Sequence, residues 1–394
     1  LIAGGQQLNG TIEVSGAKNG VLPLMVCSLL TTETFHLSNV PLLTDVQVML
    51  EMLTHYGAST EIDPLSRTLT INSASLARNY LCCPLASKMR ASIWLLAPLL
   101  LRLGQVKLEL PGGDAIGDKN SGVRKIDMHL SLLQQMGAKI TTDEKYVYGT
   151  LIGKFQATNF KFSSVSVGAT INAILACVLA QGESYLENCA IEPEITDMCN
   201  CLVSMGANIK GIGRRSIKII GVKELQGVAH KVIPDRIEAG TYLLMAAITS
   251  GSIEICGITA DMLGALCGKL EQAGCQLSWH HDRIKFLPAK CILPTNMSTG
   301  PFPDFATDLQ AQFMSLMSLA RGSSEIVENL YDNRFMHVAE LNKMGANIYV
   351  SGRKAIIQGV ERLVGTHVYA SDIRASICLV MAALAADGIT TIHN

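Results

Sequence analysis

Residues 168–210 read GATINAILACVLAQGESYLENCAIEPEITDMCNCLVSMGANIK, and they contain the whole pattern on which the fold depends. The stretch begins with an apolar run of helical length, passes a glycine and continues into a short strand signal at 184–186. A second helical run ends at Met205-Gly206-Ala207, where glycine suits a left-handed C-cap. The residues after that glycine favour a return into a sheet. The stretch therefore predicts a unit in which two helices alternate with strands.

The same order recurs six times along the chain. The openings of the six units are 66 to 78 residues apart, at Ala17, Arg90, Gly168, Ala239, Asp308 and Arg374. Each opening leads into an apolar helical run and then a strand signal, at 34–37, 106–108, 184–186, 252–255, 324–327 and 389–392. A glycine closes a second helix in five units, at Gly57, Gly137, Gly206, Gly274 and Gly345. Units of this length and content favour globular domains of three repeats each over an open solenoid.

The natural boundary between two such domains is a break near 227–234, between the third and fourth units. We expect residues 18–232 to form one domain, and residues 1–17 together with 233–394 to form the second. The sixth unit stops at Asn394, directly after its first strand. We therefore expect the last repeat to be incomplete, or its tail to lie outside this sequence.

Composition narrows the class of protein. A chain of 394 residues with 48% hydrophobic content can bury a large core. Its formal charge of −1 provides no bulk field toward nucleic acid or an anionic membrane. The longest apolar run, at 91–101, is too short to cross a bilayer, and the twelve cysteines include no Cys-x-x-Cys pair. We expect a cytoplasmic protein with reduced thiols that uses no metal or cofactor and binds neither nucleic acid nor membrane.

Cations occupy the starts of three helices. Arg90 and Arg374 each open the sequence Arg-Ala-Ser-Ile before an apolar run, where the helix dipole disfavours a positive charge and a compensating anion is expected. The alternative is two solvated arginines. Lys18-Asn19 follows Ser15-Gly16-Ala17, and backbone N–H groups there can cradle a phosphate or carboxylate. An ordinary polar turn explains that segment equally well.

Two aspartates stand at comparable positions. Asp308 precedes an apolar helix, where an aspartate is commonly an N-cap or an acid of the first turn. Asp114 lies in a glycine-rich segment after a strand, which is a candidate loop over a site. The alternative is that the Asp114 side chain only forms a hydrogen bond with its own backbone in a turn. That segment lacks Gly-Lys-Ser/Thr and is not a Walker loop. The run Trp-His-His-Asp at 279–282 predicts an exposed hairpin end rather than a metal cluster, because neighbouring strand residues point to opposite faces.

Taken together, the motifs resemble the UDP-N-acetylglucosamine 1-carboxyvinyltransferase family over the whole chain. The similar segments are Ser-Gly-Ala-Lys-Asn (15–19), Met-Arg-Ala-Ser-Ile-Trp (89–94), Ser-Val-Gly-Ala-Thr (166–170), Glu-Pro-Glu-Ile (192–195), Pro-Asp-Arg-Ile-Glu (234–238) and Asn-Arg-Phe-Met-His (333–337). The resemblance implies an α/β (α+β) enolpyruvyl transferase fold, a two-domain inside-out α/β barrel built from six βαβαββ-type repeats. It also implies transfer of the enolpyruvyl group of phosphoenolpyruvate to the 3′-hydroxyl of UDP-N-acetylglucosamine with release of phosphate, the first committed step of peptidoglycan precursor synthesis.

The resemblance also assigns roles residue by residue. Asp114 takes the general-acid position, Asp308 accepts the hydroxyl proton, and Lys18 and Arg374 complete the catalytic set. Phosphoenolpyruvate is held by Lys18, Asn19, Arg90, Arg124, Arg334 and Arg374. UDP-N-acetylglucosamine is held by Arg90, Arg124, Lys125, Ile126, Asp127, Met128, Ser166, Val167, Gly168, Asp308 and Leu330.

This chain departs from the family pattern at several places. Asp114 replaces the usual cysteine. The carboxyl can act as an acid only if its pKa is raised well above the reference of about 3.9 or if the optimum pH of the enzyme is lower. The thiol-alkylating epoxide fosfomycin loses its target. The segment 118–123 is longer than in relatives, Lys125 stands where proline is usual, and Ser164 replaces a lysine of the nucleotide site. Relatives also carry a further arginine in a segment beyond the position of Asn394.

Two alternatives remain beside this function. A catalytically impaired paralogue that binds nucleotide sugar as a regulator is consistent with Asp114, although such a protein has no use for the base Asp308. The related 3-phosphoshikimate enolpyruvyl transferase shares the fold, but its lysine-serine opening and Asn-Ala-Gly-Thr signature are absent here.

Overall fold

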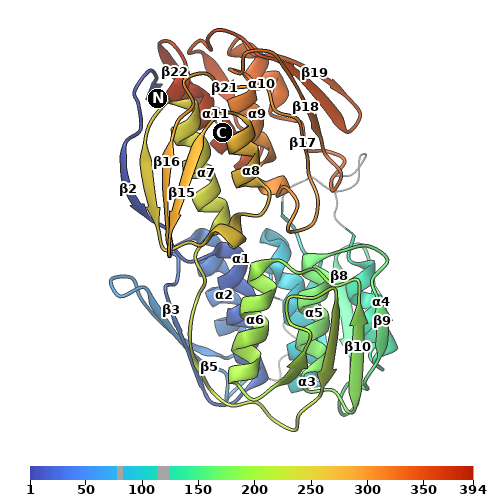
Figure 1. Cartoon of the computed structure of the whole chain (residues 1–394). Coiled ribbons are helices and arrows are strands. Elements are labelled where there is room, and N and C mark those ends of the chain that lie inside the picture. Colours follow the sequence, from blue (N-terminus) through green and yellow to red (C-terminus); the bar gives the residue numbers. More distant parts are fainter. Residues whose placement is uncertain (78–82, 114–124, 394) are drawn as a thin grey trace. The chain divides into compact units, whose positions relative to one another are not determined.

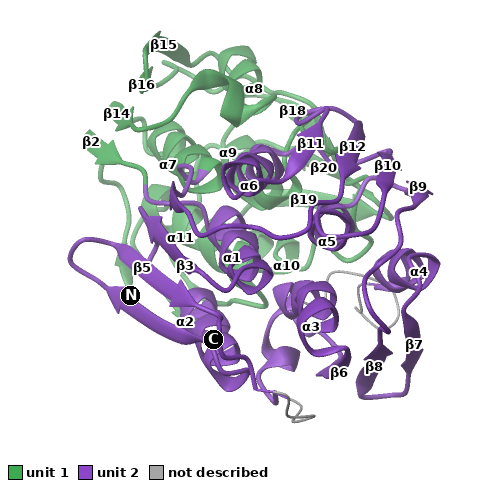
Figure 2. Ribbon diagram, turned by 90° about the horizontal axis from the view of Figure 1, so that it is seen from below, with its two compact units in different colours: residues 1–14, 114–124, 236–394 green, residues 15–113, 125–235 purple. Residues whose placement is uncertain are grey.

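The computed structural model describes residues 1–77, 83–113 and 125–393. These residues fall into two compact units (Figures 1 and 2). Of the described residues, unit 1 contains Leu1–Val14 and everything from Arg236 onward, and unit 2 contains Ser15–Gly113 and Lys125–Asp235. The first fourteen residues therefore belong with the C-terminal part of the chain.

Each repeat begins with a helix that is buried on nearly all sides. In α5 (Val167–Cys177), every residue from Ala169 to Cys177 is fully buried. A helix that is apolar all round is stable only in the interior, because it has no face to offer to water. The other opening helices are α1 (Lys18–Cys27), α3 (Leu96–Leu103), α7 (Arg236–Ile248), α9 (Gln310–Met317) and α11 (Ile373–Ala385).

The six predicted first strands are confirmed. They are β3 (Thr34–Ser38), β6 (Gln105–Glu109), β10 (Glu183–Glu187), β14 (Ile253–Cys256), β18 (Ser323–Val327) and β22 (Ile389–His393). Five of these strands pair antiparallel with the last strand of a hairpin; the hairpins are β4 (Ser59–Asp63) with β5 (Thr68–Asn72), β7 (Lys139–Thr142) with β8 (Tyr146–Thr150), β11 (Asn208–Lys210) with β12 (Ser216–Ile220), β15 (Gln276–His280) with β16 (Arg283–Leu287), and β19 (Asn347–Ser351) with β20 (Lys354–Gln358). The 279–282 segment lies at the exposed end of the hairpin β15–β16, as expected.

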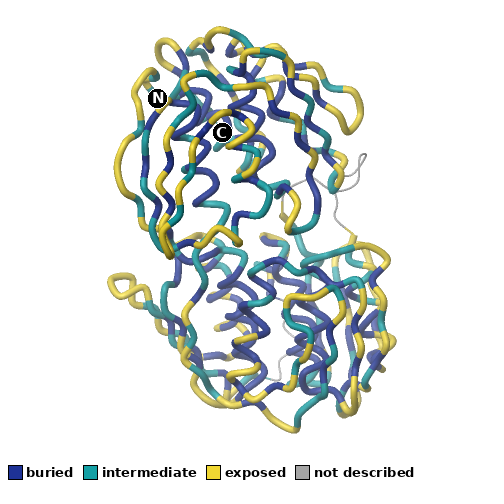
Figure 3. Tube along the Cα trace, in the orientation of Figure 1, coloured by how far each residue is buried: buried dark blue, intermediate teal, exposed yellow. Residues whose placement is uncertain are grey.

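Alternation of buried and exposed residues shows which way the sheets face. In β10, Ser184 and Leu186 are buried while Glu183, Tyr185 and Glu187 are exposed. Such a sheet covers a core with one face and meets water with the other. Because the opening helices are buried and the strands are half-exposed, the helices of each unit lie inside and the sheets outside, as the burial colours in Figure 3 show.

The second helices close on glycine in the way the sequence predicts. These helices are α2 (Thr44–His55), α4 (Asp127–Gln135), α6 (Pro193–Ser204), α8 (Leu266–Gln272) and α10 (Val338–Lys343). The glycines that follow them have positive φ, from +92° at Gly345 to +102° at Gly137 and Gly206. An L-residue rarely adopts this left-handed backbone, so glycine is the residue that fits.

Short strands from outside the repeats complete several sheets. In unit 1, β2 (Gly10–Glu13) pairs in parallel with β14, and β22 lies between β1 (Ile2–Ala3) and β21 (His367–Tyr369). In unit 2, β13 (Ala229–Lys231) pairs in parallel with β3, almost 200 residues away in sequence. Two further short strands pair with first strands of the repeats: β9 (Asn159–Lys161) lies beside β10, and β17 (Met297–Ser298) lies beside β18.

The segment that opens at Arg90 differs from the expected α-helix. Arg90–Leu95 is a 3-10 helix, and α3 begins only at Leu96. Pro98 has no N–H to donate to the carbonyl of Trp94, so the α-helical bond at this point is absent. The Ser92 hydroxyl donates to the carbonyls of Ala86 and Met89 at 2.7 and 2.9 Å and holds the tight turn in place.

Helix length bears on membrane insertion. The longest helices in the described part of the chain, α7 and α11, have 13 residues. About 20 residues are needed to span the hydrocarbon core of a bilayer. A helix able to do so is not found among the described residues.

The glycine caps predict a matched pair of substitutions in unit 1. Gly345→Ala meets no neighbouring atom, but it forces alanine to φ +92°, so we expect the free energy of unfolding to fall by about 1–2 kcal/mol. Gly268 is exposed, lies within α8 and has an ordinary φ. Gly268→Ala reduces the backbone entropy of the unfolded chain, so we expect the free energy of unfolding to rise by about 0.5–1 kcal/mol. Urea unfolding of both variants measures the difference, and equal effects would contradict the cap assignment.

Candidate active site

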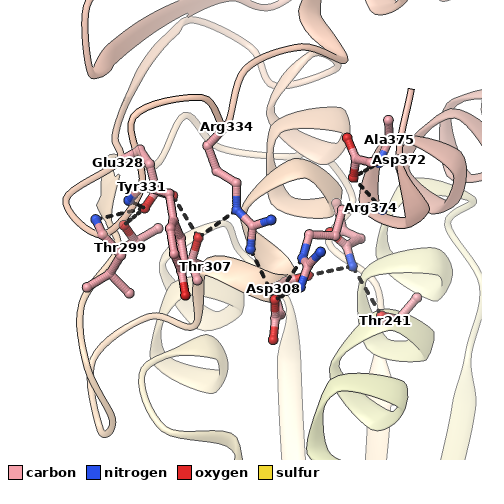
Figure 4. A network of polar contacts seen from close by, with 12 residues as sticks. Thr241, Thr299, Thr307, Asp308, Glu328, Tyr331, Arg334, Asp372, Arg374 and Ala375 are labelled. Atoms are coloured by element: carbon pink, nitrogen blue, oxygen red, sulfur yellow. Dashed lines mark hydrogen bonds and ion pairs between the residues drawn. The ribbon is translucent and has the colours of Figure 1, made fainter. Parts of the chain in front are cut away.

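An aspartate held by two arginines forms the centre of the charged site in unit 1 (Figure 4). Asp308 lies in the 3-10 helix Thr307–Leu309 that leads into α9, and Arg374 lies in the first turn of α11. Asp308 Oδ1 accepts from Arg374 Nε at 2.7 Å and Nη2 at 2.6 Å, and from Arg334 Nη2 at 3.1 Å. Arg374 therefore has the compensating anion that its position at a helix start requires.

The two arginines set the charge state of the aspartate. Burial by itself raises the pKa of Asp308, but the positive charges of Arg374 and Arg334 outweigh it and hold that pKa well below its usual range. Only 4% of the Arg334 side chain is exposed, compared with 26% of Asp308. Burial lowers the pKa of the Arg334 guanidinium, which the nearby Arg374 lowers further. Asp308 is thus ionised at neutral pH, and its Oδ1 accepts from three guanidinium nitrogens.

The structure rejects the simple alternative in which Asp308 caps its helix. Its side chain makes no capping bond; it faces the arginines instead. The capping aspartate is Asp372, whose Oδ1 accepts from the backbone N–H groups of Arg374 and Ala375 at 2.9 and 3.2 Å. Asp372 fixes the start of α11 and thereby the backbone from which Arg374 projects.

Arg334 is fixed on several sides. Its Nε donates to Thr307 Oγ1 at 3.1 Å, and its guanidinium lies 5.1 Å from the centre of the Tyr331 ring. Thr307 Oγ1 in turn lies 2.9 Å from the buried carboxylate of Glu328, which also accepts from the backbone N–H of Leu330. Neither Thr307 nor Glu328 was expected from the sequence. The available signal was weak: a threonine beside Asp308 and an acid at the end of a strand.

In unit 2, internal carboxylates occupy the positions around Lys18. The ammonium of Lys18 is 3.3 Å from Asp45 Oδ2, and its backbone N–H donates to Asp235 Oδ2 at 3.0 Å. The helix start that we expected to bind an anion therefore binds a carboxylate of the chain itself, that of Asp235. Lys18 and Asn19 are both half-buried.

A second group in unit 2 brings Arg90 to the start of α4. Arg90 Nη2 donates to the carbonyl of Lys125 at 2.5 Å. Burial and the charge of Arg90 lower the pKa of His129 to about 3, so this histidine is neutral at physiological pH. Of the nucleotide-sugar residues expected here, Lys125 and Asp127 are exposed, and Ile126 and Met128 are half-buried.

The start of α5 joins the same group. Ser166 caps α5 by accepting from Ala169 N at 3.3 Å, with Val167 as the first helical residue. The carbonyl of Gly168 accepts from Trp94 Nε1 at 3.1 Å. A Cβ at Gly168 would lie 3.3 Å from the His129 ring, so a larger residue here would require the ring to shift. Arg90, Lys125 and Ser166–Gly168 are therefore linked through Trp94 and His129.

The structure thus gathers the expected site residues into groups within each unit. Asp308, Arg334 and Arg374 are in direct contact in unit 1, while the groups around Lys18 and Arg90 belong to unit 2. Asp114, Arg124 and the longer segment 118–123 lie outside the described residues.

Comparison with known proteins identifies the class. A sequence profile of the EPSP synthase (3-phosphoshikimate 1-carboxyvinyltransferase) family matches residues 2–394. Among solved structures, the enolpyruvyl transferase NikO from Streptomyces tendae has a TM-score of 0.89 at 23% identity, covering 100% of this chain and 92% of that one. EPSP synthase from Acinetobacter baumannii has a TM-score of 0.75 at 19% identity, with coverages of 100% and 93%. These similarities confirm the expected enolpyruvyl transferase fold.

Closer relatives define the family within that class. The UDP-N-acetylglucosamine 1-carboxyvinyltransferase of Orientia tsutsugamushi (strain Ikeda) is 50% identical over 396 residues, covering 100% of this chain and 93% of the relative. The enzyme of the same name from Rickettsia bellii (strain OSU 85-389) is 48% identical with the same coverage. The chain belongs to the UDP-N-acetylglucosamine 1-carboxyvinyltransferase family, as its motifs indicate.

The lowered pKa of Asp308 predicts a pH-dependent contribution to stability. A carboxyl whose pKa is depressed on folding stabilises the folded state above its unfolded pKa of about 3.9, and this contribution is lost as pH falls toward the folded value. We expect Asp308→Asn to lower the free energy of unfolding by about 1.5–3 kcal/mol at pH 7, with a deficit that shrinks below about pH 4. Denaturant unfolding from pH 7 to pH 3 tests this, and a deficit independent of pH would show that the charge is not responsible.

Proposed function

We propose that this chain transfers the enolpyruvyl group of phosphoenolpyruvate to the 3′-hydroxyl of UDP-N-acetylglucosamine and releases phosphate. The main support is sequence identity: about half of the residues, over the whole chain, are identical to those of enzymes named UDP-N-acetylglucosamine 1-carboxyvinyltransferase. The hydroxyl oxygen adds to C2 of phosphoenolpyruvate while C3 gains a proton. The tetrahedral intermediate then loses phosphate from C2 and a proton from C3, which restores the double bond.

Binding of a small trianionic substrate requires several cations. We assign Lys18, Asn19, Arg90 and Arg124 to phosphoenolpyruvate, with Arg334 and Arg374 supporting it. Arg334 is the best supported of these by geometry, because it is nearly buried and its Nη1 has no hydrogen-bond partner among the described residues. A buried guanidinium donor without a partner is costly, and an anionic oxygen of the substrate would satisfy it.

Asp308 is assigned the role of general base for the 3′-hydroxyl. With both arginines bound to it, the carboxylate has the right charge but is a weak base, since its pKa is held low. Substrate anions that draw the guanidinium groups of Arg334 and Arg374 onto themselves weaken these bonds and raise the basicity of Asp308. The base thus becomes effective only when phosphoenolpyruvate is bound.

The remaining roles follow the family pattern. Asp114 takes the general-acid position and delivers the proton to C3, which requires its carboxyl to be protonated when it acts. The nucleotide sugar is assigned to the segment 124–128, to Ser166–Gly168, where the Gly168 carbonyl accepts from Trp94, and to Leu330, whose backbone N–H donates to Glu328. We place the reaction at the first committed step of peptidoglycan precursor synthesis, in the cytoplasm, with fosfomycin resistance as a consequence of Asp114.

Two alternatives are not favoured. Enzymes named EPSP synthase are 19% identical to this chain, far below the 48–50% of the relatives named for UDP-N-acetylglucosamine. A regulator that only binds nucleotide sugar would not need the arrangement in which two arginines share the carboxylate of Asp308.

Phosphate release tests the proposed function directly. The chain, incubated with phosphoenolpyruvate, should release phosphate only when UDP-N-acetylglucosamine is present, and it should not respond to shikimate 3-phosphate. In the control variant Asp308→Ala, loss of the base should reduce turnover by about 100-fold or more while the nucleotide sugar still binds. Sugar binding by the wild-type chain without phosphate release, across a pH series, would favour the regulator.

The identity of residue 114 predicts drug sensitivity. The wild-type chain should retain activity after incubation with fosfomycin, because a carboxylic acid lacks the nucleophilic thiolate that opens the epoxide. Asp114→Cys should be inactivated in a time-dependent way, and phosphoenolpyruvate should protect it. An active Asp114→Cys variant that resists fosfomycin would remove residue 114 from the catalytic position.

A further inference from the structure

A buried carboxylate next to the charged site has a complete set of hydrogen-bond donors. Glu328 directly follows β18 and has no exposed surface. Its Oε1 accepts from Thr299 Oγ1 at 2.9 Å and from the backbone N–H groups of Leu330 and Tyr331 at 2.9 and 3.2 Å, and its Oε2 accepts from Thr307 Oγ1 at 2.9 Å. Figure 4 shows these contacts on one side of Arg334 and Asp308 on the other.

Glu328 accepts on both oxygens, three bonds on Oε1 and one on Oε2. A glutamine with its amide oxygen at the Oε1 position would keep the three bonds of that oxygen. Its NH₂ would then donate to Thr307 Oγ1, so the direction of the bond between residue 328 and Thr307 would be reversed. The carboxylate of Glu328 therefore sets the direction in which the Thr307 hydroxyl donates.

Thr307 carries this constraint to the charged site. A hydroxyl has one hydrogen, and in Thr307 that hydrogen points to Glu328, so a lone pair of Oγ1 faces Arg334 Nε at 3.1 Å. Thr307 also precedes Asp308, which binds the same guanidinium through Nη2. Arg334 is thus held at Nε and Nη2 and against the Tyr331 ring, which leaves Nη1 as the buried donor with no partner among the described residues.

We infer that Glu328 is a positioning residue for the enolpyruvyl transfer: through Thr307 it fixes the plane of the Arg334 guanidinium so that Nη1 is presented to an anionic oxygen of phosphoenolpyruvate. Through the N–H groups of Leu330 and Tyr331 it also holds the backbone of the segment that leads to Arg334. Glu328 does not itself contact the reacting atoms. This inference rests on the proposed function, since it assigns Arg334 to that substrate.

The chain provides a matched pair of threonines for the test. Thr307 and Thr299 each donate to Glu328 at 2.9 Å, but only Thr307 contacts Arg334. Thr299 is nearly fully buried and its hydroxyl accepts a further bond from Asn329 N at 2.9 Å, whereas Thr307 is half-buried. If these threonines matter only for stability, Thr299→Val must be the more damaging change.

The experiment first compares steady-state kinetics and thermal unfolding of three threonine variants with the wild-type chain, once that chain has been shown to release phosphate. Thr307→Val should lower kcat/KM for phosphoenolpyruvate by about 10- to 100-fold, the value of a hydrogen bond to a charged group, with a smaller change in KM for the nucleotide sugar. Thr307→Ser should restore most of that loss. Thr299→Val should lower Tm more than Thr307→Val but kcat/KM less.

A double variant tests whether Glu328 acts through Thr307. Glu328→Gln, which reverses the hydrogen bond to Thr307 and removes the negative charge, should reduce kcat/KM by no more than Thr307→Val does, and the double variant Glu328→Gln/Thr307→Val should be no slower than Thr307→Val alone. The inference would be overturned if the reductions in kcat/KM caused by the two single changes multiply in the double variant. It would also be overturned by an unchanged kcat/KM in Thr307→Val, or by a larger loss of kcat/KM in Thr299→Val than in Thr307→Val. If Glu328→Gln does not fold, the three threonine variants still decide it. A wild-type chain that releases no phosphate would refute the proposed function instead.

Discussion

Six helices that are apolar on nearly every side constrain the whole arrangement. Such a helix must be surrounded, and the chain achieves this in each unit by placing helices inside and half-exposed sheets outside. Helix sides are then unavailable for chemistry, and polar groups are left at the helix ends. Asp308, leading into α9, and Arg374, at the start of α11, meet at 2.6 Å because their helices pack together with these ends adjacent.

In each unit, cations that we assign to the proposed function are held by carboxylates of the chain itself. Asp308 binds Arg334 and Arg374, and Asp45 and Asp235 accept from the ammonium and the backbone N–H of Lys18. Close pairing of this kind keeps partly buried positive charges from repelling one another. Under the proposed function, an anionic substrate would compete with these carboxylates, and its binding would raise the basicity of Asp308.

Arg334 and Arg374 are supported by residues to which we assign no chemical role. Asp372 caps α11 and sets the backbone of Arg374, while Glu328 and Thr307 hold Arg334 from the other side. In unit 2, Gly168 permits the close approach of His129 and Trp94, which join Arg90 to the start of α5. A directed guanidinium requires such support, because a long side chain otherwise loses much of its binding energy to conformational freedom.

The sequence by itself determined the repeats, the six first strands and the glycine caps, because these depend on the periodicity and backbone preferences of residues close together in the chain. It left open whether Arg374 has a compensating anion or is solvated. Only the tertiary structure decided that Asp308 rather than Asp372 provides that anion and that Glu328 reaches Arg334 through Thr307. It also decided that β13 completes the sheet of β3 and β2 that of β14. Hydrogen bonds and ion pairs act at about 3 Å whatever the separation in sequence, so local pattern carries no record of which distant partner is chosen.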